Sequence, residues 1–459
     1  MWNDASGKAL DLRRSSNQLD FGVAKGDLSW DGTGFSQTLR PTFAFFPRSK
    51  QSAEVAKHAI ARENLWLPNA ADLERTSALG PFRRDCLEPN IRFVEGLKAN
   101  LTFMLRSRDK WKWNGLANFG DYRTNFAKGA SEERGHTPMR WTLNGRYGWR
   151  NDSGDIGFGI LRAGLFLDNR EMALAGIDHA LHTTEVDVYH GSLFAPPRGY
   201  EGAVHRRGRD HWSGSPQAQY SPSSGIYLSK WLTGDARLDD ALKGLRAFAV
   251  NDGGKSSPLP AQAWILRYME TRDDADLQTA VTLLTRASDF WNEKAEGTPL
   301  TGPAKLFAKH SIRRVDNGFT TVIHFYEATG DPAYLRAVRD SAFFHRFDNG
   351  KGGESGDDIA WEVKGVLGYL LANGIVPDEK ESAFLKNAAE QAQKLYPTED
   401  WGDSFTLDYD RLAEIITQKL PPAGSSAYRD TYPVVSRAKW VFYGLPYFGV
   451  TSPFLSKEN

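Results

Sequence analysis

The sequence predicts a mainly helical protein, an (α/α) toroid or barrel of helical hairpins with a short β-region before it and an aromatic-rich tail after it. Apolar residues recur at helical spacing over most of the chain. Short turns with Gly or Asp separate successive helices, and one turn sequence repeats. The length of 459 residues allows two or three domains. We expect the end of a β-sandwich-like region and a linker over 1–84, a toroid domain over 85–420, and a tail over 421–459 packed on the toroid.

Both ends of the chain differ in pattern from its helical body. Residues 1–50 alternate turn signals with short aromatic runs that are typical of strands. They hold too few strands to close a sheet by themselves, so we expect more of a β-domain upstream. A helix is expected at Ser52 to Arg62, followed by a loop rich in Pro and Asn over 66–90. The tail from Pro421 is rich in Tyr, Trp and Phe, and we expect it to form a final helix or strands.

The body of the chain repeats one turn between two amphipathic helices. The copies are Thr233-Gly234-Asp235, Thr271-Arg272-Asp273 and Thr329-Gly330-Asp331, with a weaker copy at Leu167-Asp168-Asn169. Gly suits the residue after a helix, and Asp or Asn suits the cap of the next helix. The threonines are 38 and 58 residues apart, which disfavours a regular TPR-like array. Long, unequal loops between five or six hairpins favour a toroid with an active site on one rim.

Composition excludes several classes of partner. Lys+Arg and Asp+Glu both number 57, so no global field attracts nucleic acid or an anionic membrane. The only cysteine, Cys86, excludes an intrachain disulfide and a Cys-rich metal site. No apolar run approaches the roughly 20 residues of a membrane span, and the first residues have no signal-peptide pattern. The oligomeric state is not indicated.

One long loop, Asp187 to Tyr220, concentrates residues that carry chemistry. It contains three histidines, four arginines, a tryptophan and the closing tyrosine: His190, His205 and His211, then Arg198, Arg206, Arg207 and Arg209, with Trp212 and Tyr220. Loops of this length are uncommon in compact domains unless they bind or catalyse. Guanidinium groups hold anions, and imidazole and phenol groups transfer protons. On a neutral chain, this local cluster favours an enzyme acting on a small acidic group rather than on a polyanion.

Three other segments carry polar side chains that we expect near this loop. In Asn118 to Arg123, a turn at Gly120 would present Tyr122 and Arg123, although a surface Asx turn is an alternative. Asn151 either caps the helix expected at 157–167 or turns its amide toward the same pore. Arg314 either completes a ring of polar groups or belongs to a solvated basic turn.

A metal site is considered and not predicted. His182, Asp187 and His190 are residue types that bind metals, but their spacing matches no zinc pattern, and a hydrogen-bonded His–Asp pair is an equal alternative. No cofactor is predicted, and a calcium requirement is left open. The chain has no P-loop, no Gly-x-Gly-x-x-Gly after a strand, no Gly-x-Ser-x-Gly and no His-Glu-x-x-His. These absences argue against nucleotide-binding and serine-hydrolase functions.

Short motifs over nearly the whole chain resemble one family, the exo-acting rhamnogalacturonan lyases. The end of that family's central β-sandwich is similar to Trp2, Leu10 to Arg13 and Gly22 to Lys25. Its α/α-toroid domain is similar to Asn118 to Asp121, His182, Asp187 to His190, His211-Trp212 and Leu232 to Asp235. Gly26-Asp27-Leu28 and Tyr220 depart from the pattern, the latter standing where a histidine is expected, which leaves the sugar open. The resemblance implies β-elimination on a uronate-containing polysaccharide or oligosaccharide, and that substrate class implies a secreted or periplasmic protein.

The expected mechanism assigns a role to each candidate residue. Arg123, Arg206 and Arg209 would neutralise the carboxylate, which stabilises the enolate formed when the neighbouring C–H loses its proton. His211 and Tyr220 would transfer protons, with His190 and His205 as substitutes. The candidate catalytic residues are therefore His211, Tyr220, His190 and Arg123. The candidate substrate-binding residues are Asn118, Tyr122, Asn151, His205, Arg206, Arg209, Trp212 and Arg314.

Two alternatives remain open from the sequence. An α/α-toroid glycoside hydrolase needs two carboxylates flanking the scissile bond, for which Asp121, Asp187 and Asp210 are candidates. A non-catalytic carbohydrate-binding protein would need only aromatic platforms, which 14 tryptophans could supply.

Overall fold

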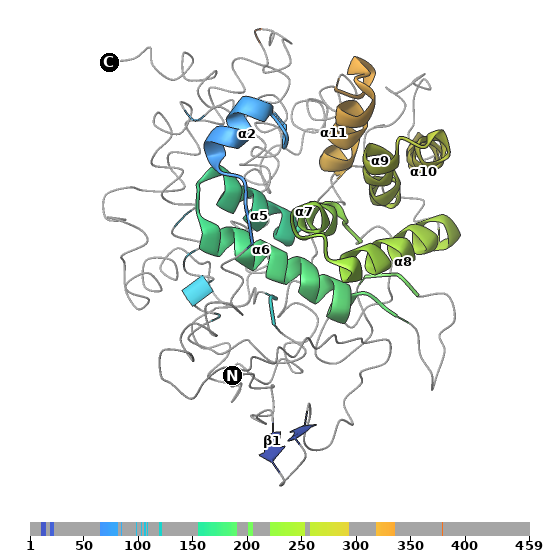
Figure 1. Cartoon of the computed structure of the whole chain (residues 1–459). Helices are drawn as coiled ribbons and strands as arrows, with labels where there is room; N and C mark the ends of the chain where they lie inside the picture. Colours follow the sequence, from blue (N-terminus) through green and yellow to red (C-terminus); the bar gives the residue numbers. More distant parts are fainter. Residues whose placement is uncertain are drawn as a thin grey trace, which may run out of the picture.

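The computed structural model describes several separate parts of the chain. These are residues 11–14, 19–22, 65–80, 155–190, 201–204, 221–252, 258–292 and 318–335, with 84, 98, 102, 105–106, 108, 119–121 and 379. The described part is mainly helical, as the sequence predicts (Figure 1). The helix expected at 52–62, the turns around 30–46 and the aromatic tail from residue 421 lie outside it.

A short β-hairpin and a short helix precede the helical body. The strands β1 (Asp11–Arg14) and β2 (Leu19–Gly22) pair antiparallel, with Asp11 opposite Gly22. The loop expected over 66–90 is wrong in part, because residues 70–76 form the helix α2 (Ala70–Thr76). Asn69 is the N-cap of this helix, since its side chain accepts a hydrogen bond from the Asp72 N–H (2.8 Å).

The body is a series of helical hairpins. The first contains α5 (Ile156–Phe166) and α6 (Arg170–His182), the second α7 (Ser224–Thr233) and α8 (Ala236–Asp252), and the third α9 (Leu259–Thr271) and α10 (Asp274–Asn292); α11 (Gly318–Thr329) opens a fourth. The first helices contact one another in succession, α5 with α7, α7 with α9, and α9 with α11. The second helices pack on this series, since α6 contacts α5 and α7, α8 contacts α7 and α9, and α10 contacts α9.

The repeated Thr-x-Asp turn forms the same hydrogen bonds in each of its three copies. In the first, the Thr233 hydroxyl donates to the carbonyl of Ser229 (2.7 Å) and accepts from the Asp235 N–H (3.2 Å), and the Asp235 carboxylate accepts from the Arg237 N–H (3.0 Å). The Thr271 and Thr329 copies repeat all three bonds. The threonine therefore ends one helix while the aspartate begins the next.

The residue inside each turn is left-handed, and glycine fills that position in two copies. Gly234 has φ +64° and Gly330 has φ +72°. Arg272 takes the same conformation with φ +55°. Its guanidinium donates to the carbonyl of Ala328 (3.0 Å) at the end of α11 and lies 5.4 Å from the Tyr268 ring centroid. These contacts offset the strain of a left-handed arginine.

Close packing of α5 on α6 depends on two glycines. A β-carbon at Gly164 would lie 2.3 Å from the Ala173 nitrogen, and one at Gly176 would lie 2.5 Å from the Leu161 nitrogen. The helix expected at 157–167 is confirmed to within one residue, but its cap is Asp155 and not the segment at Asn151. The Asp155 carboxylate accepts from the Gly225 N–H (3.0 Å), which ties α5 to the start of α7.

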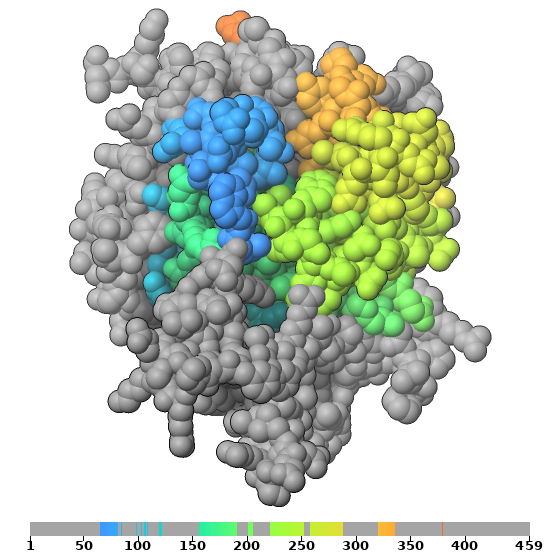
Figure 2. All heavy atoms as spheres, viewed as in Figure 1, coloured from blue at the N-terminus to red at the C-terminus, as the bar shows by residue number. Residues whose placement is uncertain are grey.

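Residues 65–80, blue in Figure 2, lie on one face of the molecule between α5 and the α7–α8 hairpin. The N–H of Ala70 donates to the Asp168 carboxylate at the α5–α6 turn (2.7 Å), and the Arg162 side chain on α5 donates to the carbonyl of Leu79. Within the described ranges, no helix has the length and apolar character needed to cross a membrane.

Candidate functional site

The basic loop begins directly after α6, where the helix widens. Thr183–Asp187 form a π-helical turn, and the Val188 N–H donates to the carbonyl of Thr183 (2.9 Å). All five residues of this turn are buried. Single π-turns at the end of α-helices occur frequently at functional sites, because they reorient the side chains that follow.

Two backbone hydrogen bonds join the start of this loop to the described residues in its middle. The Tyr189 N–H donates to the carbonyl of Ala203 (2.8 Å), and the Gly202 N–H donates to the carbonyl of Tyr189 (2.7 Å). The next residue, Val204, donates from its N–H to the hydroxyl of Ser221 (3.3 Å). We call Tyr189, Gly202, Ala203, Val204 and Ser221 the loop junction. All five residues are buried, so the junction is a fixed point of the fold.

Four fully buried ionisable side chains lie beside the start of this loop. The Nε2 atom of His182 is 3.5 Å from a carboxylate oxygen of Asp121 and 3.5 Å from one of Asp187. The Nδ1 atom of His179 is 4.0 Å from the other Asp121 oxygen and 3.0 Å from the carbonyl of Gly120. The two imidazole rings are nearly parallel, with 12° between their planes. We call Asp121, His179, His182 and Asp187 the buried cluster.

The buried cluster brings together two motifs that are about 60 residues apart in the sequence. Gly120 packs on the backbone of Asp178, where a β-carbon would lie 2.2 Å from the carbonyl oxygen. The Phe119 ring meets the His182 ring edge-on at 5.5 Å. His182 and Asp187 lie 3.5 Å apart, and Asp121 lies equally close to the same nitrogen of His182 as a second carboxylate. A hydrogen bond within a His–Asp pair stays a prediction. In the described ranges, no three His, Cys, Asp or Glu side chains are arranged to hold a metal ion.

His190 is the predicted catalytic residue that the structure describes. Its side chain is exposed, and its Nε2 atom lies 2.6 Å from the carbonyl oxygen of Thr184 in the π-helical turn. A carbonyl only accepts hydrogen bonds, so Nε2 of His190 donates to it. An imidazole fixed in this way is suited to accept a proton from a bound molecule.

The remaining predicted site residues lie outside the described residues. They are Asn118, Tyr122, Arg123, Asn151, His205, Arg206, Arg209, His211, Trp212, Tyr220 and Arg314. Their described neighbours in sequence do lie together: Tyr189 precedes His190, Val204 precedes His205, and Ser221 follows Tyr220. Asp121, which precedes Tyr122, lies in the buried cluster at the start of the same loop.

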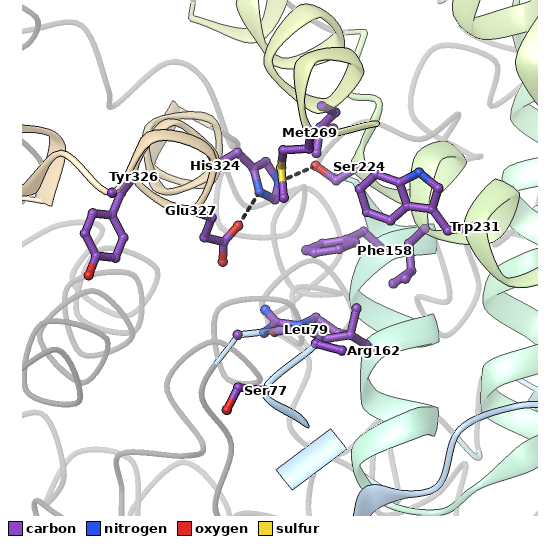
Figure 3. Close-up of a pocket in the computed structure, with 15 residues that line it drawn as sticks. Ser77, Leu79, Phe158, Arg162, Ser224, Trp231, Met269, His324, Tyr326 and Glu327 are labelled. Carbon is purple, nitrogen blue, oxygen red and sulfur yellow. Dashed lines mark hydrogen bonds and ion pairs between the residues drawn. The ribbon is translucent and has the colours of Figure 1, made fainter. Parts of the chain in front are cut away.

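The structure also shows a constellation that the sequence motifs do not reveal. A cavity of about 390 Å³ lies between the 77–80 segment and helices α5, α7, α9 and α11 (Figure 3). In its wall, the hydroxyl of Ser224 lies 3.0 Å from Nε2 of His324, and Nδ1 of that ring lies 2.8 Å from a carboxylate oxygen of Glu327. Arg162 lines the same cavity. His324 is spaced three residues from Glu327 on one helix face, which is the single signal in the sequence for this pair.

Comparison with known proteins gives no family for this chain. No protein-family model matches it, and no curated protein matches it either. Its function is therefore inferred from the residues and their geometry.

Proposed function

We propose that this protein is a polysaccharide lyase that cleaves a uronic-acid-containing polysaccharide or oligosaccharide by β-elimination. The loop junction is the observation that carries the proposal. Its three hydrogen bonds hold Tyr189, Val204 and Ser221 close together, and these are the immediate sequence neighbours of His190, His205 and Tyr220. On this proposal, the imidazoles of His190 and His205 and the phenol of Tyr220 would remove and return a proton at one sugar.

The reaction needs a carboxylate to be neutralised before the neighbouring C–H becomes acidic enough. Arg123, Arg206 and Arg209 are the proposed clamps, since guanidinium groups bind carboxylates in a bidentate way. The fixed positive charge stabilises the enolate that develops as the proton leaves, and such preorganised charge contributes several kcal/mol to catalysis. Asn118, Tyr122, Asn151, Trp212 and Arg314 are proposed to complete the substrate site.

Proton transfer is assigned to His211 and Tyr220, with His190 and His205 in support. His190 supports this assignment, because its Nε2 atom lies 2.6 Å from the Thr184 carbonyl oxygen and this contact fixes the orientation of the ring. The buried cluster helps to position His190, since the contact between His182 and Asp187 holds the π-helical turn that precedes it.

The fold that we propose for the body is a closed α/α toroid with the aromatic tail packed on it. The successive contacts of α5, α7, α9 and α11 support this closure, because inner helices that touch in order are what a ring of hairpins requires. A secreted or periplasmic location is part of the same proposal, since large uronate polysaccharides occur outside the cytoplasm.

The structure argues against one of the carboxylate pairs that a glycoside hydrolase could use, Asp121 with Asp187. Asp121 and Asp187 are both fully buried, and each lies 3.5 Å from the same nitrogen of His182. Two carboxylates that share one imidazole inside the protein have no room for a glycosidic bond between them. The geometry therefore favours elimination over hydrolysis by this pair.

One assay separates the candidate functions. The protein is incubated with uronate-containing oligosaccharides, and both ultraviolet absorbance and reducing ends are followed. A lyase produces an unsaturated uronate that absorbs together with new ends. A hydrolase produces ends without the absorbance, and a binding protein produces neither, so either of these two results would contradict the proposal.

Variants then test the residues. His211→Ala and Tyr220→Phe should each lower kcat/KM by about 10²- to 10⁴-fold, the range for a general acid or base. His190→Ala tests the supporting base, and Glu201→Gln, an exposed residue beside the loop junction, is its matched control with an expected change of less than about twofold. Full activity in both His211→Ala and Tyr220→Phe would overturn the site assignment.

A further inference from the structure

The cavity between α5, α7, α9 and α11 has an apolar wall with a few polar groups gathered on one side. Its apolar lining includes Phe158, Leu228, Leu266 and Met269, and Trp231 lies at its edge with 42% of its surface exposed. The volume of about 390 Å³ is within the range of small-molecule sites. A cavity of this kind is large enough to hold a small organic molecule beside the polar groups.

The polar side consists of a chain of three side chains. Glu327 accepts from Nδ1–H of His324 (2.8 Å), which leaves Nε2 to accept from the hydroxyl of Ser224 (3.0 Å). Figure 3 shows this chain running from α11 to the first residue of α7. A hydroxyl, a base within hydrogen-bond reach and a third group that orients the base are the arrangement of an activated nucleophile.

The backbone on both sides of Ser224 is fixed by buried polar side chains. The Ser223 N–H donates to the Gln262 side chain (2.7 Å), and the Gly225 N–H donates to the Asp155 carboxylate (3.0 Å). The Phe158 ring meets the His324 ring edge-on at 6.2 Å. Nucleophile and base are therefore held in place before any ligand binds, which is what catalysis by preorganised groups requires.

From this geometry we propose a second catalytic site, independent of the lyase site, that hydrolyses carboxylic esters. Ser224 is the nucleophile and His324 is the general base, while Glu327 is a positioning residue that fixes the His324 ring. The substrate is an ester whose acyl group and part of whose alcohol fill the cavity.

The chemical step balances without any further reactant than water. The Ser224 oxygen forms a bond to the carbonyl carbon while its proton passes to Nε2 of His324. The bond to the alcohol oxygen breaks, and that oxygen takes the proton from His324. Water then attacks the acyl-serine, His324 accepts a proton from the water and returns it to Ser224, and the carboxylic acid leaves.

One fixed positive charge favours the oxyanion that forms on the carbonyl oxygen in this step. The N-terminus of α7, where Ser224 is the first residue, does not add to it, because the Asp155 carboxylate already accepts from the Gly225 N–H there. Arg162 places a guanidinium in the wall of the same cavity, where it lies 5.6 Å from the Phe158 ring centroid. Developing negative charge at the carbonyl oxygen is stabilised by charge that is already in position.

The test uses the full chain with an alkyl fluorophosphonate and with p-nitrophenyl acetate. The fluorophosphonate should attach once per chain, and peptide mass mapping should find it on Ser224. The wild-type protein should release p-nitrophenol, and Ser224→Ala and His324→Gln should lower kcat/KM by more than about 10³-fold. Ser229→Ala, a buried serine on the same helix and away from the cavity wall among the described residues, is the matched control and should keep full activity.

The Glu327→Gln variant tests whether Glu327 acts on His324 during catalysis or only stabilises the fold. It should lower kcat for p-nitrophenyl acetate while KM stays within about twofold, because the amide can donate to Nδ1 of His324 and leave the proton on Nε2, which then cannot accept from Ser224, while the cavity keeps its shape. Lyase activity should be unchanged in Ser224→Ala. Failure of the ester-hydrolysis proposal can therefore be distinguished from failure of the lyase proposal.

Three results would overturn the ester-hydrolysis proposal. The first is absence of labelling and p-nitrophenol release in the folded wild-type protein. The second is labelling at another residue. The third is full esterase activity in a folded Ser224→Ala protein. The first two need no variant, so they decide the matter even if a substitution prevents folding.

Discussion

Gly202 lies directly against Gly244, and this contact attaches the loop junction to α8. A β-carbon on Gly202 would come 2.0 Å from the carbonyl oxygen of Gly244, and the backbone at Gly202 has φ +84°. The Gly202 N–H also donates to the carbonyl of Tyr189 (2.7 Å). The position of the basic loop therefore depends on the absence of a side chain at residue 202.

Gly202→Ala should destabilise the protein much more than Gly234→Ala, although both glycines are left-handed. At Gly234 (φ +64°) a β-carbon meets nothing within 4 Å, so only the backbone strain of about 1–2 kcal/mol is expected. At Gly202 the backbone of α8 must also move, which adds about 1–3 kcal/mol. Urea unfolding measures both changes. Equal losses in the two variants would show that the contact with Gly244 is not tight.

Asp121→Ala should destabilise the protein, because it removes a fully buried carboxylate that lies beside two buried imidazoles. His179 and His182 then lose a polar neighbour inside the protein, and leaving buried polar groups without a partner costs about 1–3 kcal/mol. Asp240→Ala is the matched control, since the Asp240 side chain is 75% exposed beside Lys243 and should cost under about 1 kcal/mol. A change in unfolding free energy below about 1 kcal/mol for Asp121→Ala would contradict a structural role of the buried cluster.

The repeated turn predicts equal and additive effects at separate hairpins. Thr233→Val removes the hydroxyl that joins the Ser229 carbonyl to the Asp235 N–H, and should cost about 1 kcal/mol. Thr329→Val should cost a similar amount, because its hydroxyl makes the same two bonds. The two turns share no partner, so the double variant should lose the sum of the single losses within about 0.5 kcal/mol. Denaturation midpoints of the three variants check this, and strong non-additivity would count against independent turns.

Much of the local structure can be predicted from the sequence, because turns and helix ends depend on residues that are close together in the chain. The three Thr-x-Asp turns separate helices as predicted, and the weaker copy at Asp168 is a turn with φ +52°. His182 and Asp187 also lie close together (3.5 Å), because they are five residues apart at the end of one helix. The expectation fails at α2, because Pro and Asn residues predict a loop there, whereas Asn69 is the N-cap of a short helix.

Contacts between distant segments were not predictable in this way. Asp121 lies beside His182 because Gly120 packs on α6, and no local sequence pattern predicts that these two segments are in contact. Ser224 and His324 are 100 residues apart, and they meet because α7 and α11 both pack on α9. The absence of a Gly-x-Ser-x-Gly sequence does not exclude this pair, since that motif marks a strand-to-helix turn and Ser224 is the first residue of helix α7.

Tyr227 predicts how stability changes at alkaline pH. Its hydroxyl is buried, donates to the carbonyl of Ala263 (2.9 Å) and accepts from Arg246 (2.7 Å). Burial is the main cause that raises its pKa above the ordinary value of 10.0, while the charge of Arg246 acts in the opposite direction. A raised pKa in the folded state means that the unfolded chain releases this proton first. The stability contributed by neutral Tyr227 is therefore complete below about pH 10 and is lost as the pH rises above it.

Tyr227→Phe should accordingly be less stable than the wild type at pH 7 and should approach it at alkaline pH. The variant loses two hydrogen bonds in a buried site, which costs about 1–3 kcal/mol at neutral pH. Above about pH 10 only the wild type pays to keep this phenol neutral, so the difference in unfolding free energy narrows. Urea unfolding of both proteins between pH 7 and 11 measures the difference. A gap that stays constant over this range would mean that Tyr227 ionises as readily in the folded protein as in the unfolded chain, against the burial that raises its pKa.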